Sequence, residues 1–327
     1  MRRRKRTALR ASRKKASYPY IPIYSDEVLL AAPECICLSS EWHSSLALFL
    51  QKIRGAFKAG SPICIDFRAT KLVVAPGMIL LYSEISRIID IDPGFKIRCI
   101  PARDDVVNQV FKHLGFYTYF DFSSDAIPVL PSVVSWKYAS SAVVDGDSVG
   151  ELLLTYESLK PASRHVYAAA TEAMINSVDH AYSADRADGL PKPSAERWRL
   201  FCREDDGKIV IAVCDLGVGI PNTLPINFKE IIEGLFGKSG RGRVKSDARI
   251  IEAAMEIGRS RYETMGRKGR GKGFYDMRRL VDEVGGATLQ IYSNRGYLMY
   301  MGGQYSRRNF DISIMGTVVV WIIPVGR

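Results

Sequence analysis

The sequence has no apolar run as long as the roughly 20 residues that a membrane-spanning helix needs. Its basic start is not followed by the apolar segment of a signal peptide. Histidine is scarce, with four residues in 327, and the six cysteines show no Cys-x-x-Cys spacing. We therefore expect a cytoplasmic protein without a membrane span, with reduced cysteines in its core and without a zinc site.

Acidic residues are absent from the first 15 positions, where nine lysines and arginines stand. Without these nine, the formal net charge of +11 falls to about +2. Such a segment has too little apolar surface to fold alone, so residues 1–22 are predicted to form a basic disordered tail. Two roles stay open: residues 2–15 attract nucleic acid or another acidic surface, or they only add solubility.

Short apolar runs alternate with helical patterns from residue 23 to residue 122, which predicts an α/β sandwich. Strands are expected at Glu34–Leu38, Pro62–Phe67 and Lys96–Ile100, and helices at Leu46–Phe57, Gly77–Ile89 and Asp104–Leu114. Residues 123–150 are rich in Ser, Val and Pro, and are expected to be a linker with one strand at Ser132–Tyr138. A second domain is predicted over residues 151–327.

A buried strand at Lys208–Cys214 runs into Asp215 and then into a turn with two glycines, Gly217 and Gly219. An apolar strand that stops at an aspartate places a carboxylate at the edge of a sheet, where a ligand can reach it. Glycines there permit positive φ and close approach to the backbone. Alone this pattern is weak, because Asp-x-Gly-x-Gly occurs in many loops.

Residues 168–182 predict a helix in which Glu172, Asn176 and His180 recur every four residues and share one face. A carboxylate one helical turn from a carboxamide can take a proton from water beside a metal-bound phosphate. We expect His180 to be a packing residue near this face rather than a ligand.

Residues 269–274 read Gly-Arg-Gly-Lys-Gly-Phe and precede a helical pattern at residues 275–284. Glycines that open a helix expose N–H groups at the positive end of its dipole, which suits phosphate. The last strand then begins with a hydroxyl at Thr317. The basic, glycine-rich residues 221–268 between these motifs suit a lid, with a helix expected at Ala248–Gly258.

These four elements, in this order, resemble the ATP-binding domain of the GHKL superfamily, which includes gyrase-type topoisomerases, heat-shock chaperones and histidine kinases. The resemblance covers residues 156–324 and implies a Bergerat-type sandwich, with helices on one face of a mixed, mostly antiparallel sheet. It implies that Glu172 activates water, that Asn176 holds Mg²⁺ and that Asp215 accepts a hydrogen bond from adenine, helped by Thr317. The remaining nucleotide-binding residues that it implies are Gly217, Gly219, Gly269, Gly271, Lys272 and Gly273.

The N-terminal pattern resembles a STAS domain, the fold of anti-sigma-factor antagonists, in its segments at residues 63–67, 73–81 and 107–116. Antagonists of that family carry a phosphorylatable serine before the helix. The matching turn here, residues 74–77, reads Val-Ala-Pro-Gly and has no hydroxyl. Regulation by this domain would therefore have to use contact, or the binding of something else, rather than phosphorylation of that turn.

Together these features predict a Mg²⁺-dependent ATP-binding protein of the histidine kinase-like ATPase family. Its further activity is open. One hypothesis is an ATPase or protein kinase that acts in trans on a regulatory protein partner in a signalling system. A second is a nucleotide-gated interaction module without appreciable turnover, and a third adds nucleic-acid association through the basic tail. A homodimer is an expectation from the family resemblance alone.

Overall fold

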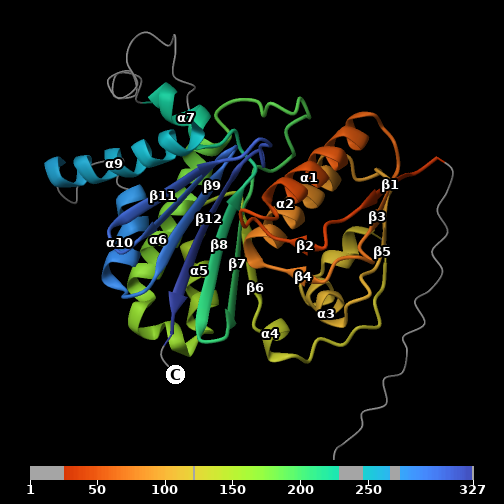
Figure 1. Ribbon diagram of the computed structural model, residues 1–327, viewed down its shortest axis with the longest axis horizontal. Helices are drawn as coiled ribbons and strands as arrows, with labels where there is room; N and C mark the ends of the chain where they lie inside the picture. Colours follow the sequence, from red (N-terminus) through yellow and green to blue (C-terminus); the bar gives the residue numbers. More distant parts are fainter. Residues whose placement is uncertain (1–25, 121, 228–245, 266–272, 326–327) are drawn as a thin grey trace, which may run out of the picture.

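The computed structural model describes residues 26–120, 122–227, 246–265 and 273–325 (Figure 1). They form a mixture of helices and sheets, so the expected α/β class is confirmed. The predicted basic tail lies outside the described residues, and so do residues 228–245 and 266–268 of the predicted lid.

The N-terminal half contains a three-stranded parallel sheet in the order β1-β3-β5 and a two-stranded parallel pair, β2-β4. These strands are β1 (Val28–Ala31), β2 (Cys35–Ile36), β3 (Ile63–Asp66), β4 (Leu72–Val73) and β5 (Ile97–Ile100). The helices are α1 (His43–Lys58), α2 (Ala75–Ile91) and α3 (Asp105–His113). The three helices and three strands expected here are present with shifted ends, whereas β1 and β4 were not predicted because they are short and half exposed.

The C-terminal half is built on a seven-stranded sheet in the order β11-β10-β9-β12-β8-β7-β6. Its strands are β6 (Lys137–Ser141), β7 (Trp198–Asp205), β8 (Lys208–Asp215), β9 (Thr288–Ser293), β10 (Gly296–Met301), β11 (Gln304–Asn309) and β12 (Thr317–Pro324). Every pairing in this sheet is antiparallel, so the expectation of a mixed sheet is corrected.

Tight turns explain why the sheet is antiparallel. Asp206 and Gly207 join β7 to β8 with φ of 48° and 69°, and Gly302 and Gly303 join β10 to β11 with φ of 56° and 80°. Two consecutive residues with positive φ match the right-handed twist of a hairpin, which favours antiparallel neighbours. Asn294, at φ 52°, begins the turn between β9 and β10 in the same region of backbone conformation.

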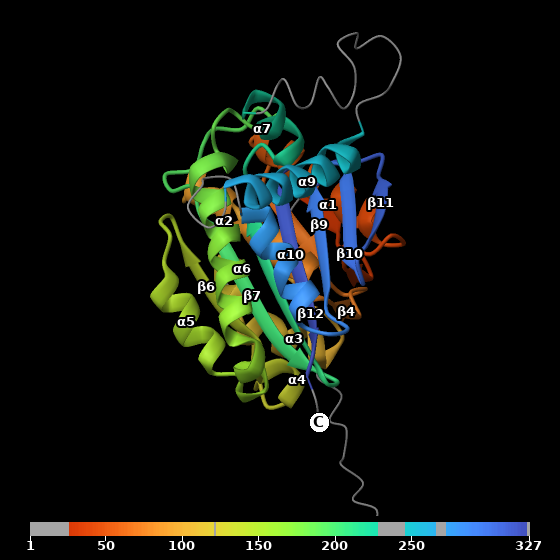
Figure 2. The same cartoon turned by 90° about the vertical axis from the view of Figure 1, so that its left-hand side faces the viewer.

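The sheet is covered on both faces (Figures 1 and 2). Helices α5 (Gly146–Leu154), α6 (Ser163–Asn176) and α10 (Gly273–Glu283) share one core with inward side chains of the central strands, among them Ile211, Val213, Val319 and Trp321. The alternate side chains, including Ala212, Cys214, Val318 and Val320, join the core of the N-terminal half. Helices α7 (Ile220–Asn227) and α9 (Asp247–Met265) pack against each other at one end of the sheet.

Helix α2 is the element that joins the two halves. Every residue from Ala75 to Ile88 is buried, as expected for a helix enclosed on all sides. The helix contacts α1 and β2 in its own half and β7, β8 and β12 in the other. At its first turn, a Cβ on Gly77 would lie 2.4 Å from the Ile36 carbonyl oxygen, so glycine is required where the helix crosses β2.

A buried ion network fastens the loop after α6 to α1 and α2. Arg186 forms a fork with Glu84, at 2.7 Å from Nη1 to Oε1 and 3.1 Å from Nη2 to Oε2. Arg54 donates to the same carboxylate at 2.9 Å, and Asp188 pairs with both Arg186 and Arg87. The network ends near β12, because Arg186 Nη1 also donates to the Met315 carbonyl oxygen at 3.0 Å.

The expected linker at residues 123–150 is corrected by the structure. This region contains α4 (Pro131–Val134), the edge strand β6 and the start of α5. The strand predicted at Ser132–Tyr138 is thus displaced to β6, Lys137–Ser141, which pairs with β7. The sequence pattern misled because β6 is a half-exposed edge strand whose residues, Lys-Tyr-Ala-Ser-Ser, carry little apolar alternation.

Candidate functional site

Four polar or amphipathic side chains form one row across the end of the large sheet. Trp198 is paired with Asp215, Asp215 with Thr317, and Thr317 with Ser293, on strands β7, β8, β12 and β9. Side chains directly opposite in a sheet point to the same face. That face is the one covered by α6 and α10, because Val213, two residues before Asp215, packs in the core beneath these helices. The row of Trp198, Asp215, Thr317 and Ser293 is called the polar row below.

Asp215 is a buried carboxylate, with 8% of the residue exposed. Its Oδ1 accepts from the Gly217 N–H at 3.0 Å. Its Oδ2 lies 3.5 Å from Ser177 Oγ, a weak contact because the Ser177 hydroxyl also donates to the Ala173 carbonyl oxygen at 2.9 Å. Burial raises the pKa of Asp215 to about 6, and these hydrogen bonds only partly oppose that rise. Within the described ranges no lysine, arginine or histidine makes a salt bridge to it. A buried carboxyl with a raised pKa and no cation beside it is a feature of functional sites.

Thr317 and Ser293 continue the row with hydroxyl groups. Their oxygens lie 3.0 Å apart. Ser293 Oγ also accepts from the Ile220 N–H at 2.9 Å and donates to the Gly316 carbonyl oxygen at 3.3 Å. Ser293 was not singled out by the sequence, although it follows the alternation of Leu289 and Ile291 and closes a strand.

Helix α6 brings the predicted metal and base residues to the start of α10. A Cβ added to Gly273 would lie 2.8 Å from Glu172 Oε2 and 3.0 Å from Asn176 Nδ2, so both side-chain ends would have to shift for a larger residue. Gly273 is therefore seated on the Glu172 and Asn176 face of the helix, as the sequence spacing predicted. The Asn176 Nδ2 atom is buried and has no hydrogen-bond partner among the described residues.

A single π-helical turn, Ser177–Ala181, follows α6 and connects it with the aspartate loop. Val218 N–H donates to the Ala181 carbonyl oxygen at 2.8 Å, and a Cβ on Gly217 would lie 2.1 Å from that oxygen. Gly219 has φ of +84°, and a Cβ there would lie 2.6 Å from the Asn294 amide. Both glycines thus allow close packing of protein on protein, which is a different role from the predicted approach of a ligand to the backbone. π-Turns of this kind are frequent at functional sites.

Several predicted residues do not join this arrangement. Gly269, Gly271 and Lys272 lie outside the described residues, as do Arg241 and Arg243 of the expected lid. His180 is exposed on the π-turn, which differs from the expected packing role. The expected helix at Ala248–Gly258 is contained within α9.

The chain matches no protein-family model that we compared it with, and no curated protein matches it. In the part of the chain that the structure describes, no helix is long and apolar enough to cross a membrane. In the same part, no group of three His, Cys, Asp or Glu side chains is arranged to hold a metal ion. A metal at this site would therefore need few protein ligands, such as one amide oxygen, together with oxygens from a bound ligand.

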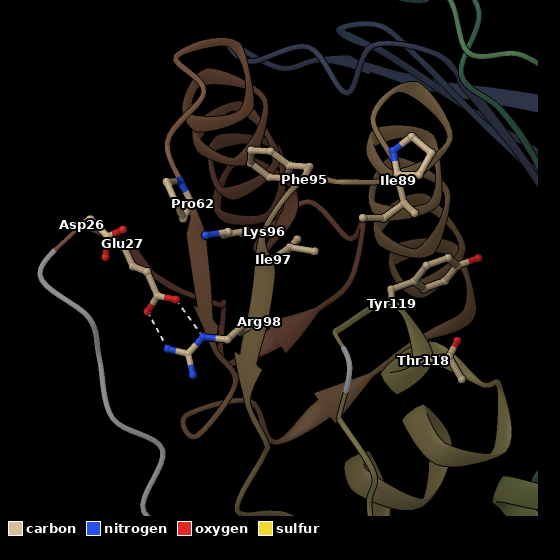
Figure 3. Close-up of a pocket in the computed structure, with 11 residues that line it drawn as sticks. Asp26, Glu27, Pro62, Ile89, Phe95, Lys96, Ile97, Arg98, Thr118 and Tyr119 are labelled. Atoms are coloured by element: carbon tan, nitrogen blue, oxygen red, sulfur yellow. Dashed lines mark hydrogen bonds and ion pairs between the residues drawn. The ribbon is translucent and has the colours of Figure 1, made fainter.

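Two cavities lie away from the polar row. One, of about 600 Å³, opens at the amino ends of β1, β3 and β5 (Figure 3), where Arg98 pairs with Glu27 at 2.7 Å and 2.6 Å. The other, of about 470 Å³, lies between α1, the loop at Asp188 and the approach to β12. Neither is lined by Asp215, Thr317, Glu172 or Asn176. In the first cavity Arg98 and Glu27 form an ion pair with each other.

Proposed function

We propose that this protein binds ATP with Mg²⁺ between the polar row, the face of α6 and the start of α10, as a member of the GHKL superfamily. The observation that carries the proposal is the convergence of Asp215, Asn176 and Gly273. Asp215 is a buried acceptor at the sheet end, and Ser177 joins it to α6 directly beside Asn176. Gly273 opens α10 against that same helix face.

The residues present fit such a ligand. Asn176 has a buried amide with an unsatisfied group, and its oxygen and nitrogen exchange places by a half-turn of the side chain. Mg²⁺ prefers a hard oxygen ligand and keeps several waters, so one amide oxygen beside phosphate oxygens suffices. The first turn of a helix presents N–H groups without intrahelical partners, which favours negative charge at the start of α10. Asp215 then accepts from the amino group of adenine.

Isothermal titration calorimetry with ATP, ADP and GTP, each with and without Mg²⁺, tests this proposal. We expect binding of ATP and ADP that weakens when Mg²⁺ is chelated, and little binding of GTP, whose carbonyl at the corresponding position cannot donate to Asp215. Absence of heat with every nucleotide, or equal affinity for ATP and GTP, contradicts the proposal.

Turnover depends on Glu172. Its carboxylate lies one helical turn before Asn176 and beside Gly273. There it is suited to activate water for attack on the γ-phosphate. If the protein is an ATPase, or a kinase that transfers phosphate to a protein partner, Glu172→Gln removes phosphate release or transfer and leaves ATP binding in place. Phosphate release that persists in this variant excludes Glu172 as the base.

A specific contact favours the second candidate, a nucleotide-gated interaction module. Helix α2 packs on β8 and β12, the strands that carry Asp215 and Thr317, and so links the nucleotide strands to the N-terminal half. We propose that this half is a STAS-like domain that acts by contact, because its turn at Val74–Gly77 has no hydroxyl and is built into the buried start of α2. Hydrogen exchange of α2 that changes on ATP addition, without phosphate release, distinguishes this candidate from an ATPase.

The remaining assignments are proposals of the same kind. All six cysteines are free thiols, which suits a reducing compartment such as the cytoplasm. Binding of nucleic acid by residues 2–15 predicts salt-sensitive affinity for DNA or RNA that is lost when those residues are deleted. Sedimentation with and without ATP tests for a homodimer.

A further inference from the structure

Ser293 occupies a place in the polar row that the proposed nucleotide site leaves without a role. It is the last residue of β9 and is completely buried. It stands beside Thr317 on the side away from Asp215, with which Thr317 is paired. A hydroxyl in this position touches the hydroxyl that the ligand would meet.

The hydrogen bonds around Ser293 favour one assignment of donors and acceptors. A hydroxyl has one hydrogen and two lone pairs. Ser293 Oγ accepts from the Ile220 N–H and donates to the Gly316 carbonyl oxygen, at 2.9 Å and 3.3 Å. The Gly316 oxygen also accepts from the Asn294 N–H at 3.1 Å. Either hydroxyl can be the donor in the 3.0 Å contact between Ser293 and Thr317. When Thr317 donates to Ser293, and Ser293 to Gly316, both hydroxyl hydrogens have an acceptor. The reverse direction leaves the Thr317 hydrogen without an acceptor among the hydrogen bonds of the described residues.

We propose that Ser293 is a positioning residue that holds the Thr317 hydroxyl as a hydrogen-bond acceptor toward the site. The Thr317 hydrogen is committed to Ser293, so only lone pairs of Thr317 face the ligand. Its neighbour Asp215 is an acceptor as well when ionised. The two therefore form an all-acceptor pair, which selects a ligand that offers an amino group. This inference rests on the proposed function, because it concerns how the same site distinguishes adenine from other bases.

Comparing adenine with hypoxanthine tests whether the site selects a donor over an acceptor at position 6 of the base. The 6-amino group of ATP donates, whereas the 6-carbonyl of inosine triphosphate accepts, and the two nucleotides are otherwise close in shape. Ser293→Ala frees the Thr317 hydrogen, which can then donate to the carbonyl of inosine triphosphate. We expect the ratio of the dissociation constant for inosine triphosphate to that for ATP to fall by about tenfold, which corresponds to one hydrogen bond.

Calorimetric titration of the full chain with Mg-ATP and Mg-inosine triphosphate measures this ratio. The variants are Ser293→Ala, Thr317→Val and their combination. If Ser293 acts through Thr317, adding Ser293→Ala to Thr317→Val leaves the ratio unchanged. A further fall in the double variant overturns the proposal, because Ser293 then acts by another route, such as its bond to Ile220.

Thr288→Val is the matched control, since it removes from the other end of β9 a buried hydroxyl that lacks a partner among the described residues. Its ratio should equal that of the wild type. Should Ser293→Ala not fold, Ser293→Cys replaces the oxygen with a poorer acceptor and must also lower the ratio. An unchanged ratio in a folded Ser293 variant overturns this inference alone, whereas a wild-type protein that binds no ATP overturns the proposed function.

Discussion

Arg186 and Glu84, 102 positions apart in the chain, form a buried two-point ion pair between the loop after α6 and helix α2. Burial opposes ionisation of Glu84, but the guanidinium groups of Arg186 and Arg54 outweigh that effect and lower the pKa of the carboxyl. The carboxylate of Glu84 thus stays ionised beneath the loop that leads from the π-turn to β7, and the two guanidinium groups neutralise its charge. Arg186 also donates to the Met315 carbonyl oxygen. Through Glu84 and Arg186, the N-terminal half therefore holds the backbone just before Thr317.

Glu84→Gln should destabilise the protein by about 3–5 kcal/mol, because it leaves the buried Arg54 without its carboxylate and Arg186 with Asp188 as its remaining one. Urea denaturation at pH 7.5 measures the change. Glu34→Gln is the matched control, since Glu34 pairs with Lys71 on the surface, and it should cost less than about 1 kcal/mol. Equally small losses of unfolding free energy in both variants would show that the buried network does not stabilise the contact between the two halves.

Asp215→Asn should stabilise the nucleotide-free protein at neutral pH. The folded pKa of Asp215 is raised to about 6 from 3.8. The folded state therefore holds the proton more tightly, and its stability falls as pH rises from about 4 to above 6, by about 3 kcal/mol in total. Asparagine has no charge to bury and still accepts from the Gly217 N–H.

Thermal denaturation between pH 4 and pH 8 tests this sign. The stability of Asp215→Asn relative to wild type should rise through this range and level off above pH 7. A variant that is less stable than wild type at pH 8 would mean that an unseen cation holds the carboxylate ionised.

Gly217→Ala should destabilise the protein by about 1–3 kcal/mol, since its methyl group would overlap the Ala181 carbonyl oxygen and force the π-turn away from the aspartate loop. Gly55→Ala is the control, because Gly55 lies inside α1 with no atom within 4 Å of the new methyl. It should stabilise by about 0.5–1 kcal/mol. Chemical denaturation compares them, and a Gly217→Ala protein as stable as wild type would contradict the close packing.

The strand that ends at Asp215 was predictable because β8 is apolar along most of its length and stops at a charge. The face shared by Glu172 and Asn176 was predictable because helix geometry depends only on spacing. Ser293 was not, because its role comes from register between β9 and β12, which are brought together only in the folded sheet. The edge strand β6 was misread as linker, since its pairing with β7 rather than its own composition makes it a strand.

The coverage of the sheet's second face was also beyond the sequence. Val318 and Val320 alternate with Val319 and Trp321 on β12, and both sets are buried. An apolar run of this kind shows that two faces are covered but does not say by what. Only the fold shows that α2 supplies the second cover.

The most direct test is a crystal structure of the protein with Mg²⁺ and a non-hydrolysable ATP analogue. We predict the adenine amino group within hydrogen-bonding distance of Asp215, the metal at the amide oxygen of Asn176, and the phosphates at the first turn of α10. Nucleotide bound instead in the cavity at the amino ends of β1, β3 and β5, or a site beside Asp215 filled by side chains, would contradict the account.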